Sequence, residues 1–276
     1  MKLRPGVPAL RPLQRTLGTL VLSAGLLVLP PAWSQTAAAP NVILINLDDA
    51  GYSDFGFNGQ GLIETPHIDS LAAGGAVCTQ GYATASVCTP SRHGLITGRY
   101  QQRFGSECNV PTEATPGYDS SHFGVDTGEH TMGDAMRAHG YRTIAIGKWH
   151  LGEQPQYRPL NRGFDEFYGF LGGNRSYWPL DNPGIGRQLM RDNTRIADQP
   201  GGEAAEFSYL TDAFTEAAVD FIDRRSQAGE KFFIYLAYNA VHTPLHALQS
   251  DKDLFPQYTD NTRKTIAAMT HSVDRG

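Results

Sequence analysis

Apolar runs along the chain alternate with stretches of helical pattern. Residues 41–47, 141–147 and 231–238 are rich in β-branched and aromatic side chains, and each run ends at polar residues. Such runs are typical of strands buried on both faces of a sheet. In residues 209–222 the apolar positions recur at helical spacing with acidic residues between them, which predicts an amphipathic helix covering that sheet. The pattern therefore predicts an α/β fold.

Two shorter helices are predicted from the signals at their ends. Residues 65–75 begin with Thr65 before a proline and end in two glycines, which predicts a short helix packed on the sheet. We expect His67 in this helix to lie at the surface and not to act as a ligand. Residues 131–139 have helical character, and Gly140 follows as the C-terminal stop.

A long segment, residues 172–206, is rich in Gly, Pro, Asn, Asp and Arg and has little periodicity. It predicts an irregular loop, and loops of this length inside a domain are usually functional or disordered. Two interpretations stay open: an ordinary surface loop, or the rim of a substrate site formed by Asn174, Arg175, Tyr177 and Trp178.

The first residues are expected to form a targeting signal that is not part of the fold. Residues 1–34 combine a basic start, an uncharged apolar run over 17–29 and small residues at its exit, which predicts a secretory signal peptide. An uncleaved membrane anchor is less favoured, because the run is too short to span a bilayer comfortably. The protein is therefore expected to be periplasmic or secreted.

Removal of residues 1–34 would take away four basic residues and no acidic one, so the formal net charge would become more negative than the −5 of the full chain. Nucleic acid is not expected as a partner. The rest is long enough for one large domain with a substantial core, and it contains no repeat or long linker. We expect that domain to cover residues 41–276.

Three cysteines in an exported chain leave one unpaired, which points to a reactive thiol. Cys88 lies where a loop is expected to turn into a helix, with proline two residues later. Unpaired N–H groups at that helix end, together with Arg92 one turn on, favour an anion. Cys78 and Cys108 suit a disulfide or two reduced thiols equally well.

Polar residues follow each of the three predicted strands: Asp48 and Asp49, then Lys148 and His150, then His242. Ligands bind at the carboxyl ends of parallel strands, so we expect these side chains to converge, although the two aspartates alone would also suit a turn. In an extended chain Lys148 and His150 project to the same side. The aspartates favour Ca²⁺ first and Mg²⁺ second over Zn²⁺.

Four sequence blocks in order carry a family resemblance. Cys88-Thr-Pro-Ser-Arg92 with Thr97-Gly-Arg99 resembles the signature of the type I sulfatases, which belong to the alkaline phosphatase superfamily. Asn46–Asp49, Gly147–Gly152 and His242-Thr-Pro244 match other blocks of that family. The resemblance runs from about residue 41 to the end. It implies a large, mostly parallel central sheet with helices on both faces, and an arylsulfatase-like N-terminal catalytic domain.

The resemblance also implies a chemistry. A maturation enzyme would oxidise Cys88 to formylglycine, whose hydrate attacks the sulfur of a sulfated small molecule or glycan. Arg92, Lys148 and His242 would neutralise the sulfate oxygens, and His150 would act as a base. The metal, Ca²⁺ or Mg²⁺, would be held by Asp48, Asp49 and the formylglycine at position 88.

The chain departs from the family pattern near its end. Relatives continue to a further strand that ends in Asp-Asn and to a second lysine, and neither is present here. Asp274 has no asparagine after it and lies in a helical pattern. The resemblance therefore implies a C-terminally truncated domain with little activity by itself. Two other functions stay open: a phosphomonoester or phosphonate hydrolase, and an exported protein that binds sulfated glycans without catalysis.

Overall fold

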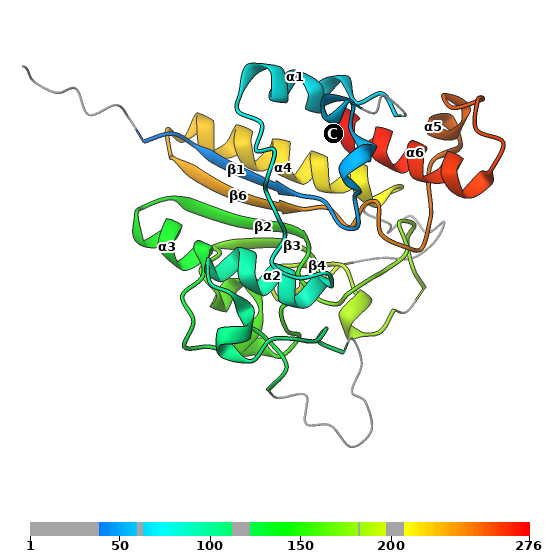
Figure 1. Ribbon diagram of the computed structural model, residues 1–276. Helices are drawn as coiled ribbons and strands as arrows, with labels where there is room; N and C mark the ends of the chain where they lie inside the picture. Colours follow the sequence, from blue (N-terminus) through cyan, green and yellow to red (C-terminus); the bar gives the residue numbers. More distant parts are fainter. Residues whose placement is uncertain (1–38, 60–62, 112–121, 182, 197–206) are drawn as a thin grey trace, which may run out of the picture. The chain divides into compact units, whose positions relative to one another are not determined.

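The computed structural model describes residues 39–59, 63–111, 122–181, 183–196 and 207–276 (Figure 1). The predicted signal peptide over 1–34 lies outside these residues and stays a prediction. Among the helices of the described part, none combines the length and the apolar character that a membrane crossing requires.

A mixed sheet forms the centre of the described part, with its strands in the order β1-β6-β2-β3-β4-β5. The first four are parallel to one another, and β3-β4-β5 are antiparallel. The strand bounds are β1 Val42–Asn46, β2 Arg142–Lys148, β3 Glu166–Phe170, β4 Met190–Arg191, β5 Thr194–Arg195 and β6 Phe232–Ala237. The expected mostly parallel α/β sheet is confirmed, and β3 is a strand that the sequence patterns did not predict.

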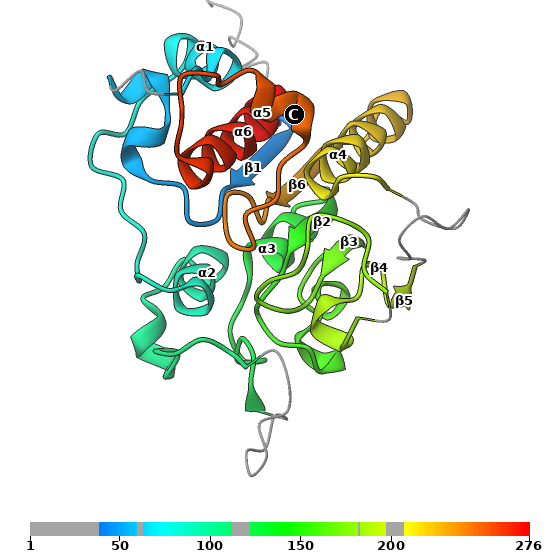
Figure 2. The ribbon, with the colours of Figure 1, turned by 90° about the vertical axis from the view of Figure 1, so that its right-hand side faces the viewer.

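Helices cover both faces of this sheet, as expected (Figures 1 and 2). Alternate residues of β6 show why, because Phe232, Ile234 and Leu236 pack in one core with α4 and α6, whereas Phe233, Tyr235 and Ala237 pack in a second core with α2 and α3. The α-helices are α1 Pro66–Gly74, α2 Cys88–Thr97, α3 Met132–Ala138, α4 Leu210–Gln227, α5 Gln249–Asp253 and α6 Asn261–Arg275. Short 3₁₀ turns lie at Tyr52–Asp54, Gly56–Asn58, Gln101–Phe104, Pro155–Tyr157, Pro159–Asn161 and Ile185–Arg187.

The prediction that every parallel strand is buried on both faces is wrong for β1. In the described part of the chain, β1 pairs only with β6 and is an edge strand. Val42 and Leu44 pack toward the core with α2 and α3, but Ile43 and Ile45 are 47% and 50% exposed. An apolar run therefore identified the strand but not its place in the sheet.

The segment 172–206 is more regular than expected where the structure describes it. It contains the 3₁₀ turn Ile185–Arg187 and the hairpin of β4 and β5, while residues 197–206 lie outside the description. Arg175 and Tyr177 are buried: the Arg175 guanidinium donates to the carbonyl of Arg187 at 3.0 Å, and the Tyr177 hydroxyl donates to the carbonyl of Asn239 at 2.7 Å. These two side chains support the loop and do not form an open rim, whereas Asn174 and Trp178 are partly exposed.

Helix α1 forms as predicted, but its N-terminus is capped from elsewhere. Thr65 occupies the N-cap position without a capping hydrogen bond. The buried carboxylate of Asp274 in α6 instead accepts from the N–H groups of Ile68 at 2.8 Å and His67 at 3.3 Å. The helix packs mainly against α6 and the turn Gly56–Asn58, so the prediction that it packs on the sheet is wrong. His67 is exposed, as expected.

Replacing Asp274 by alanine should therefore destabilise the fold. The first-turn N–H groups of α1 would lose their acceptor, and the loss of such a cap typically costs about 1–2 kcal/mol. Urea unfolding followed by circular dichroism measures the loss. Asp274→Asn keeps an acceptor oxygen and should lose less than half as much; equal stability of Asp274→Ala and the parent would contradict this role.

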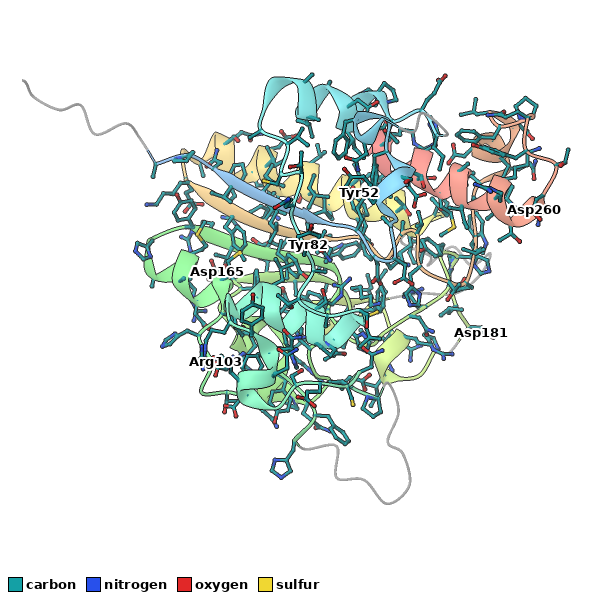
Figure 3. The ribbon with its side chains drawn as sticks, in the orientation of Figure 1. Tyr52, Tyr82, Arg103, Asp165, Asp181 and Asp260 are labelled. Carbon is teal, nitrogen blue, oxygen red and sulfur yellow. The ribbon has the colours of Figure 1, made fainter. Side chains whose placement is uncertain are left out.

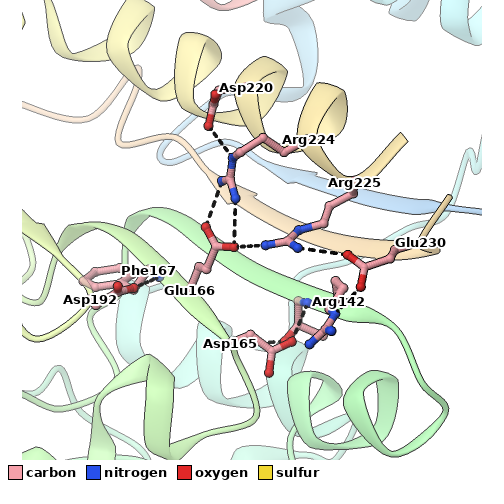
Figure 4. Close-up of polar contacts among 10 residues, drawn as sticks. Arg142, Asp165, Glu166, Phe167, Asp192, Asp220, Arg224, Arg225 and Glu230 are labelled. Carbon is pink, nitrogen blue, oxygen red and sulfur yellow. Dashed lines mark hydrogen bonds and ion pairs between the residues drawn. The ribbon is translucent and has the colours of Figure 1, made fainter. Parts of the chain in front are cut away.

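An ion-pair network joins β3 to the end of α4 on the surface (Figure 4). Arg224 donates to both oxygens of Glu166, at 2.8 and 3.1 Å, and Arg225 donates to Glu166 and, at 2.9 Å, to Glu230. Burial raises the pKa of Glu166, but the hydrogen bonds from Arg224 and Arg225 outweigh it, and the pKa lies below its ordinary value. The charged form is therefore favoured more in the folded protein than in the unfolded chain.

The lowered pKa of Glu166 predicts a loss of stability in acid. A carboxyl group whose pKa is lower in the folded protein stabilises the fold at pH values above its pKa in the unfolded chain. This stabilisation is lost as the pH falls through its pKa in the folded protein. The melting temperature should therefore fall on acidification from the ordinary range of a glutamate downward, and Glu166→Gln should flatten that part of the profile. Asp181→Asn, an exchange at a residue outside the network, is the control; a profile unchanged by Glu166→Gln would contradict the assignment.

Candidate active site

The carboxyl ends of β1, β2 and β6 meet at one place. The segments after β1 and β6 are joined there, because Asp48 N–H donates to the carbonyl of Ala240 at 2.9 Å and Val241 N–H donates to the carbonyl of Asp48 at 2.7 Å. Ligand atoms of Asp48, Cys88 and His242 lie within 4.8 Å of one another. The expected convergence of strand ends with the N-terminus of α2 is thus observed.

Cys88 is the first residue of α2, where the helix dipole favours negative charge. Its Sγ lies 3.2 Å from Nζ of Lys148 and 3.7 Å from Oδ1 of Asp48. Burial raises the pKa of the Cys88 thiol, but the hydrogen bond with His242 and the charge of Lys148 outweigh it, so the pKa is lowered. The position is arranged to hold an oxyanion or a thiolate.

Asp48 is the buried anion of the cluster. Lys148 Nζ donates to its Oδ2, and an Arg92 guanidinium nitrogen lies 3.7 Å from the same oxygen. Burial raises the pKa of Asp48, but the charges of Arg92 and Lys148 lower it further than burial raises it. The carboxylate therefore stays ionised between two buried cations.

Arg92 is held by the sheet and still has a free donor. Its Nη1 donates to the carbonyl of Lys148 at 2.6 Å and to the hydroxyl of Tyr235 at 3.4 Å. Its Nη2 is buried and makes no hydrogen bond within the described residues. A buried donor without an acceptor costs free energy, and an oxygen of a bound anion would satisfy it.

His150 does not follow the extended geometry that the alternation argument assumed. Its φ is 55°, in the left-handed region, so that argument is wrong for this residue. Nε2 lies 3.1 Å from the carbonyl of Val110, and Nδ1 is buried without a partner among the described residues. Burial and, next, the charge of Lys148 lower the pKa of His150 to about 3, so the ring is neutral at physiological pH. The neutral ring leaves the lone pair of Nδ1 available as an acceptor, but the lowered pKa makes His150 a weak base in this state.

The predicted metal ligands are only partly gathered. Asp49 is not one of the three residues whose ligand atoms cluster; its carboxylate is 61% exposed and lies 3.7 Å from Nε2 of His242. Asp48 and Asp49 offer the oxygens that Ca²⁺ and Mg²⁺ prefer, whereas the nitrogen of His242 does not suit either ion. The aspartates therefore fit a hard cation as part of its ligand set.

Two surface pockets lie beside this cluster. One, of about 660 Å³, runs between α2 and residues 82–84 and is also lined by Asn46. Tyr82 on its wall, labelled in Figure 3, is 82% exposed. The other, of about 610 Å³, is lined by His93, Cys108 and Asn109 among others. Neither pocket is lined by Asp48, Cys88 or His242.

The comparisons with known proteins bear on this cluster. A sequence model of one family, described as Sulfatase, matches residues 40–275. The chain belongs to the sulfatase family.

Curated relatives of this chain include N-acetylgalactosamine-6-sulfatase of Mus musculus, 34% identical over 83% of the chain, and arylsulfatase J of Mus musculus, 31% identical over 89% of it. The matches take up 44% and 40% of those two proteins. Among solved structures, Ps i-CgsB is 40% identical with a TM-score of 0.77, over 86% of this chain and 52% of that one. The chain therefore spans about half the length of the relatives it matches.

The sequence did not predict some other residues that support this site. Asn109, Val110 and Gly173 touch its parts from loops without a motif, and Tyr235 is one aromatic among several in β6. The first glycine of the Gly147–Gly152 block has a structural reason: Gly147 has φ 101°, and a Cβ there would lie 2.0 Å from the carbonyl oxygen of Ala237. Cys78 and Cys108, whose pairing the sequence left open, are both free and exposed.

Proposed function

We propose that this protein hydrolyses sulfate monoesters, with a carbohydrate sulfate as substrate. The observation that carries the proposal is the position of Cys88 at the N-terminus of α2, 3.2 Å from the Lys148 ammonium, inside the Cys-x-Pro-Ser-Arg block. The relatives named N-acetylgalactosamine-6-sulfatase support a sugar substrate, as does a structure of Ps i-CgsB in complex with k-i-k-neocarrahexaose that is 38% identical to this chain.

The nucleophile of this proposal is Cys88 after its oxidation to formylglycine by a maturation enzyme. The hydrated aldehyde supplies two hydroxyl groups, one to attack sulfur and one through which sulfate can leave. An unmodified thiol offers no second hydroxyl, so the modification is a condition of turnover.

The surrounding side chains then have separate tasks. Arg92, with its unsatisfied Nη2, and Lys148 bind the sulfate oxygens and stabilise the charge that grows on them as the S–O bond to the alcohol breaks. His242, which is hydrogen-bonded to Cys88, contributes in the same way. His150, neutral and with Nδ1 unoccupied, takes the proton whose removal allows sulfate to be expelled.

A hard dication, Ca²⁺ first and Mg²⁺ second, belongs to this proposal. Asp48 and Asp49 would hold it together with the modified residue 88, and it would make the attacking hydroxyl more acidic. Export to the periplasm or medium, directed by residues 1–34, would bring the enzyme to sulfated glycans outside the cell.

The test compares an aryl sulfate with the matching aryl phosphate, using protein expressed from its natural reading frame together with a formylglycine-generating enzyme. We expect turnover of the sulfate to exceed that of the phosphate and to require the aldehyde at position 88, measured by peptide mass. A faster phosphate reaction would favour the phosphohydrolase alternative. An unmodified Cys88 with glycan binding but no turnover would favour a binding protein.

A further inference from the structure

Cys88 and His150 are connected to the same short segment of loop. The N–H of Thr89, the residue after Cys88, donates to Oδ1 of Asn109 at 2.9 Å. In return, the N–H of Val110 donates to Oγ1 of Thr89 at 3.0 Å. The carbonyl of the same Val110 faces Nε2 of His150 at 3.1 Å.

The contacts are reciprocal, and the two that Val110 makes are buried. Thr89 is fully buried, and Val110 and His150 are 8% and 5% exposed, so water does not compete freely for the hydrogen bonds. The side-chain oxygen of Asn109 and the N–H of Val110 each pair with Thr89, which fixes the segment to the first turn of α2. The distance between the start of α2 and the ring of His150 is thereby set through Asn109 and Val110.

The carbonyl of Val110 also selects the tautomer of His150. A carbonyl only accepts hydrogen bonds, so Nε2 must carry the proton, and in a neutral ring the lone pair then lies on Nδ1. Nδ1 is the nitrogen that is buried without a partner among the described residues. The alternative tautomer would place two lone pairs against each other at Nε2.

Gly173 also lies against the ring of His150. A Cβ on Gly173 would lie 2.7 Å from Cε1 and 2.8 Å from Nε2 of His150, closer than side-chain atoms approach one another. The ring of His150 fits against position 173 only because glycine has no side chain. Even a methyl group there would displace the ring.

We propose that Asn109-Val110 and Gly173 form a clamp that holds His150 as its Nε2–H tautomer, with Nδ1 as the proton acceptor, at a fixed place relative to Cys88. Asn109, Val110 and Gly173 are positioning residues, because they act through His150 and Thr89. The catalytic consequence rests on the proposed function, whereas the tautomer and its dependence on the clamp do not.

The test is long-range ¹H–¹⁵N correlation NMR on the full chain labelled with ¹⁵N-histidine, with His150 assigned from the spectrum of His150→Gln. We expect the pattern of an Nε2–H ring in the parent. Thr89→Val removes the acceptor for Val110 N–H at nearly constant volume, and Gly173→Ala places a methyl group against the ring; both should give a mixture of tautomers or an exchange-broadened ring. Thr89→Ser keeps the hydroxyl and should restore the parental pattern.

Circular dichroism and a melting curve establish that each variant is folded, and Gly74→Ala, where a Cβ meets nothing within 4 Å, is the control for adding a methyl group elsewhere. An Nδ1–H ring in the parent would overturn the proposal, as would an unchanged Nε2–H ring in both Thr89→Val and Gly173→Ala. Because the spectra need no turnover, they test the clamp separately from the proposed function. The expected spectra, together with no sulfate turnover by the protein from its natural reading frame, would contradict the proposed function and leave the clamp standing.

Discussion

Cys88→Ala should abolish sulfate ester hydrolysis while leaving the fold intact. Its side chain is only partly buried at the first position of α2, so little packing is lost. The residue that becomes the nucleophile is removed, however, and loss of a nucleophile lowers turnover by a factor on the order of 10⁶ in a well-studied hydrolase. Initial rates on an aryl sulfate measure the loss, with the melting temperature as a check on folding.

The other two cysteines are the matched controls for this result. Cys78 and Cys108 are exposed and free, and neither belongs to the cluster around Asp48. Cys78→Ala and Cys108→Ala should therefore keep the parental rate. Hydrolysis that survives in Cys88→Ala, or an active parent whose position 88 is entirely thiol, would show that another group attacks sulfur.

The convergence of site residues could be predicted because it follows from strand order. Polar residues directly after parallel strands must lie at one sheet edge, which is how Asp48, Lys148 and His242 were found. The start of α2 could also be predicted, because proline at the third helical position and an apolar stretch after it indicate a helix that begins at Cys88.

What the sequence could not supply were contacts between distant segments. The cap of α1 by Asp274 joins residues more than 200 positions apart, and no local pattern contains it. Nor does a local pattern show that β1 lies at the edge, because an apolar run has the same composition there as in the middle of a sheet.

Backbone conformation was the other missing element at the site. His150 was expected to alternate with Lys148 in an extended chain, but its φ of 55° turns it toward Val110 instead. Non-glycine residues adopt such angles rarely, so neither propensity nor spacing predicts them. Residues in such conformations cluster at functional sites, where the surrounding structure holds them.

The charges around Asp48 predict opposite effects of two substitutions on stability. Lys148 and Arg92 are both buried against this one carboxylate, so the three groups carry one negative and two positive charges. Asp48→Asn leaves two buried cations without a partner, and breaking a buried pair in this way costs about 3–5 kcal/mol. Lys148→Met leaves Asp48 paired with Arg92, so unfolding in urea should show little loss or a gain.

Both substitutions should nevertheless lower turnover. Removal of one group that stabilises developing charge typically costs about 10²–10³ in rate, which is the expectation for Lys148→Met. Asp48→Asn should lose more, because it also removes a carboxylate ligand of the proposed Ca²⁺ site; calorimetric titration with Ca²⁺ should show weaker binding. Asp49→Ala separates the two roles, since its exposed carboxylate should affect Ca²⁺ binding and rate but not stability.

The double variant Asp48→Asn, Lys148→Met shows whether charge balance or packing causes the stability loss of Asp48→Asn. It returns the cluster to the parental net charge, so it should recover at least half of the stability lost in Asp48→Asn while staying inactive. If Lys148→Met proves as destabilising as Asp48→Asn, or the double variant is no more stable than Asp48→Asn, the lost stability comes from packing. The two buried cations would then be tolerated without Asp48. The excess positive charge of Lys148 and Arg92 would not be a source of free energy for binding sulfate.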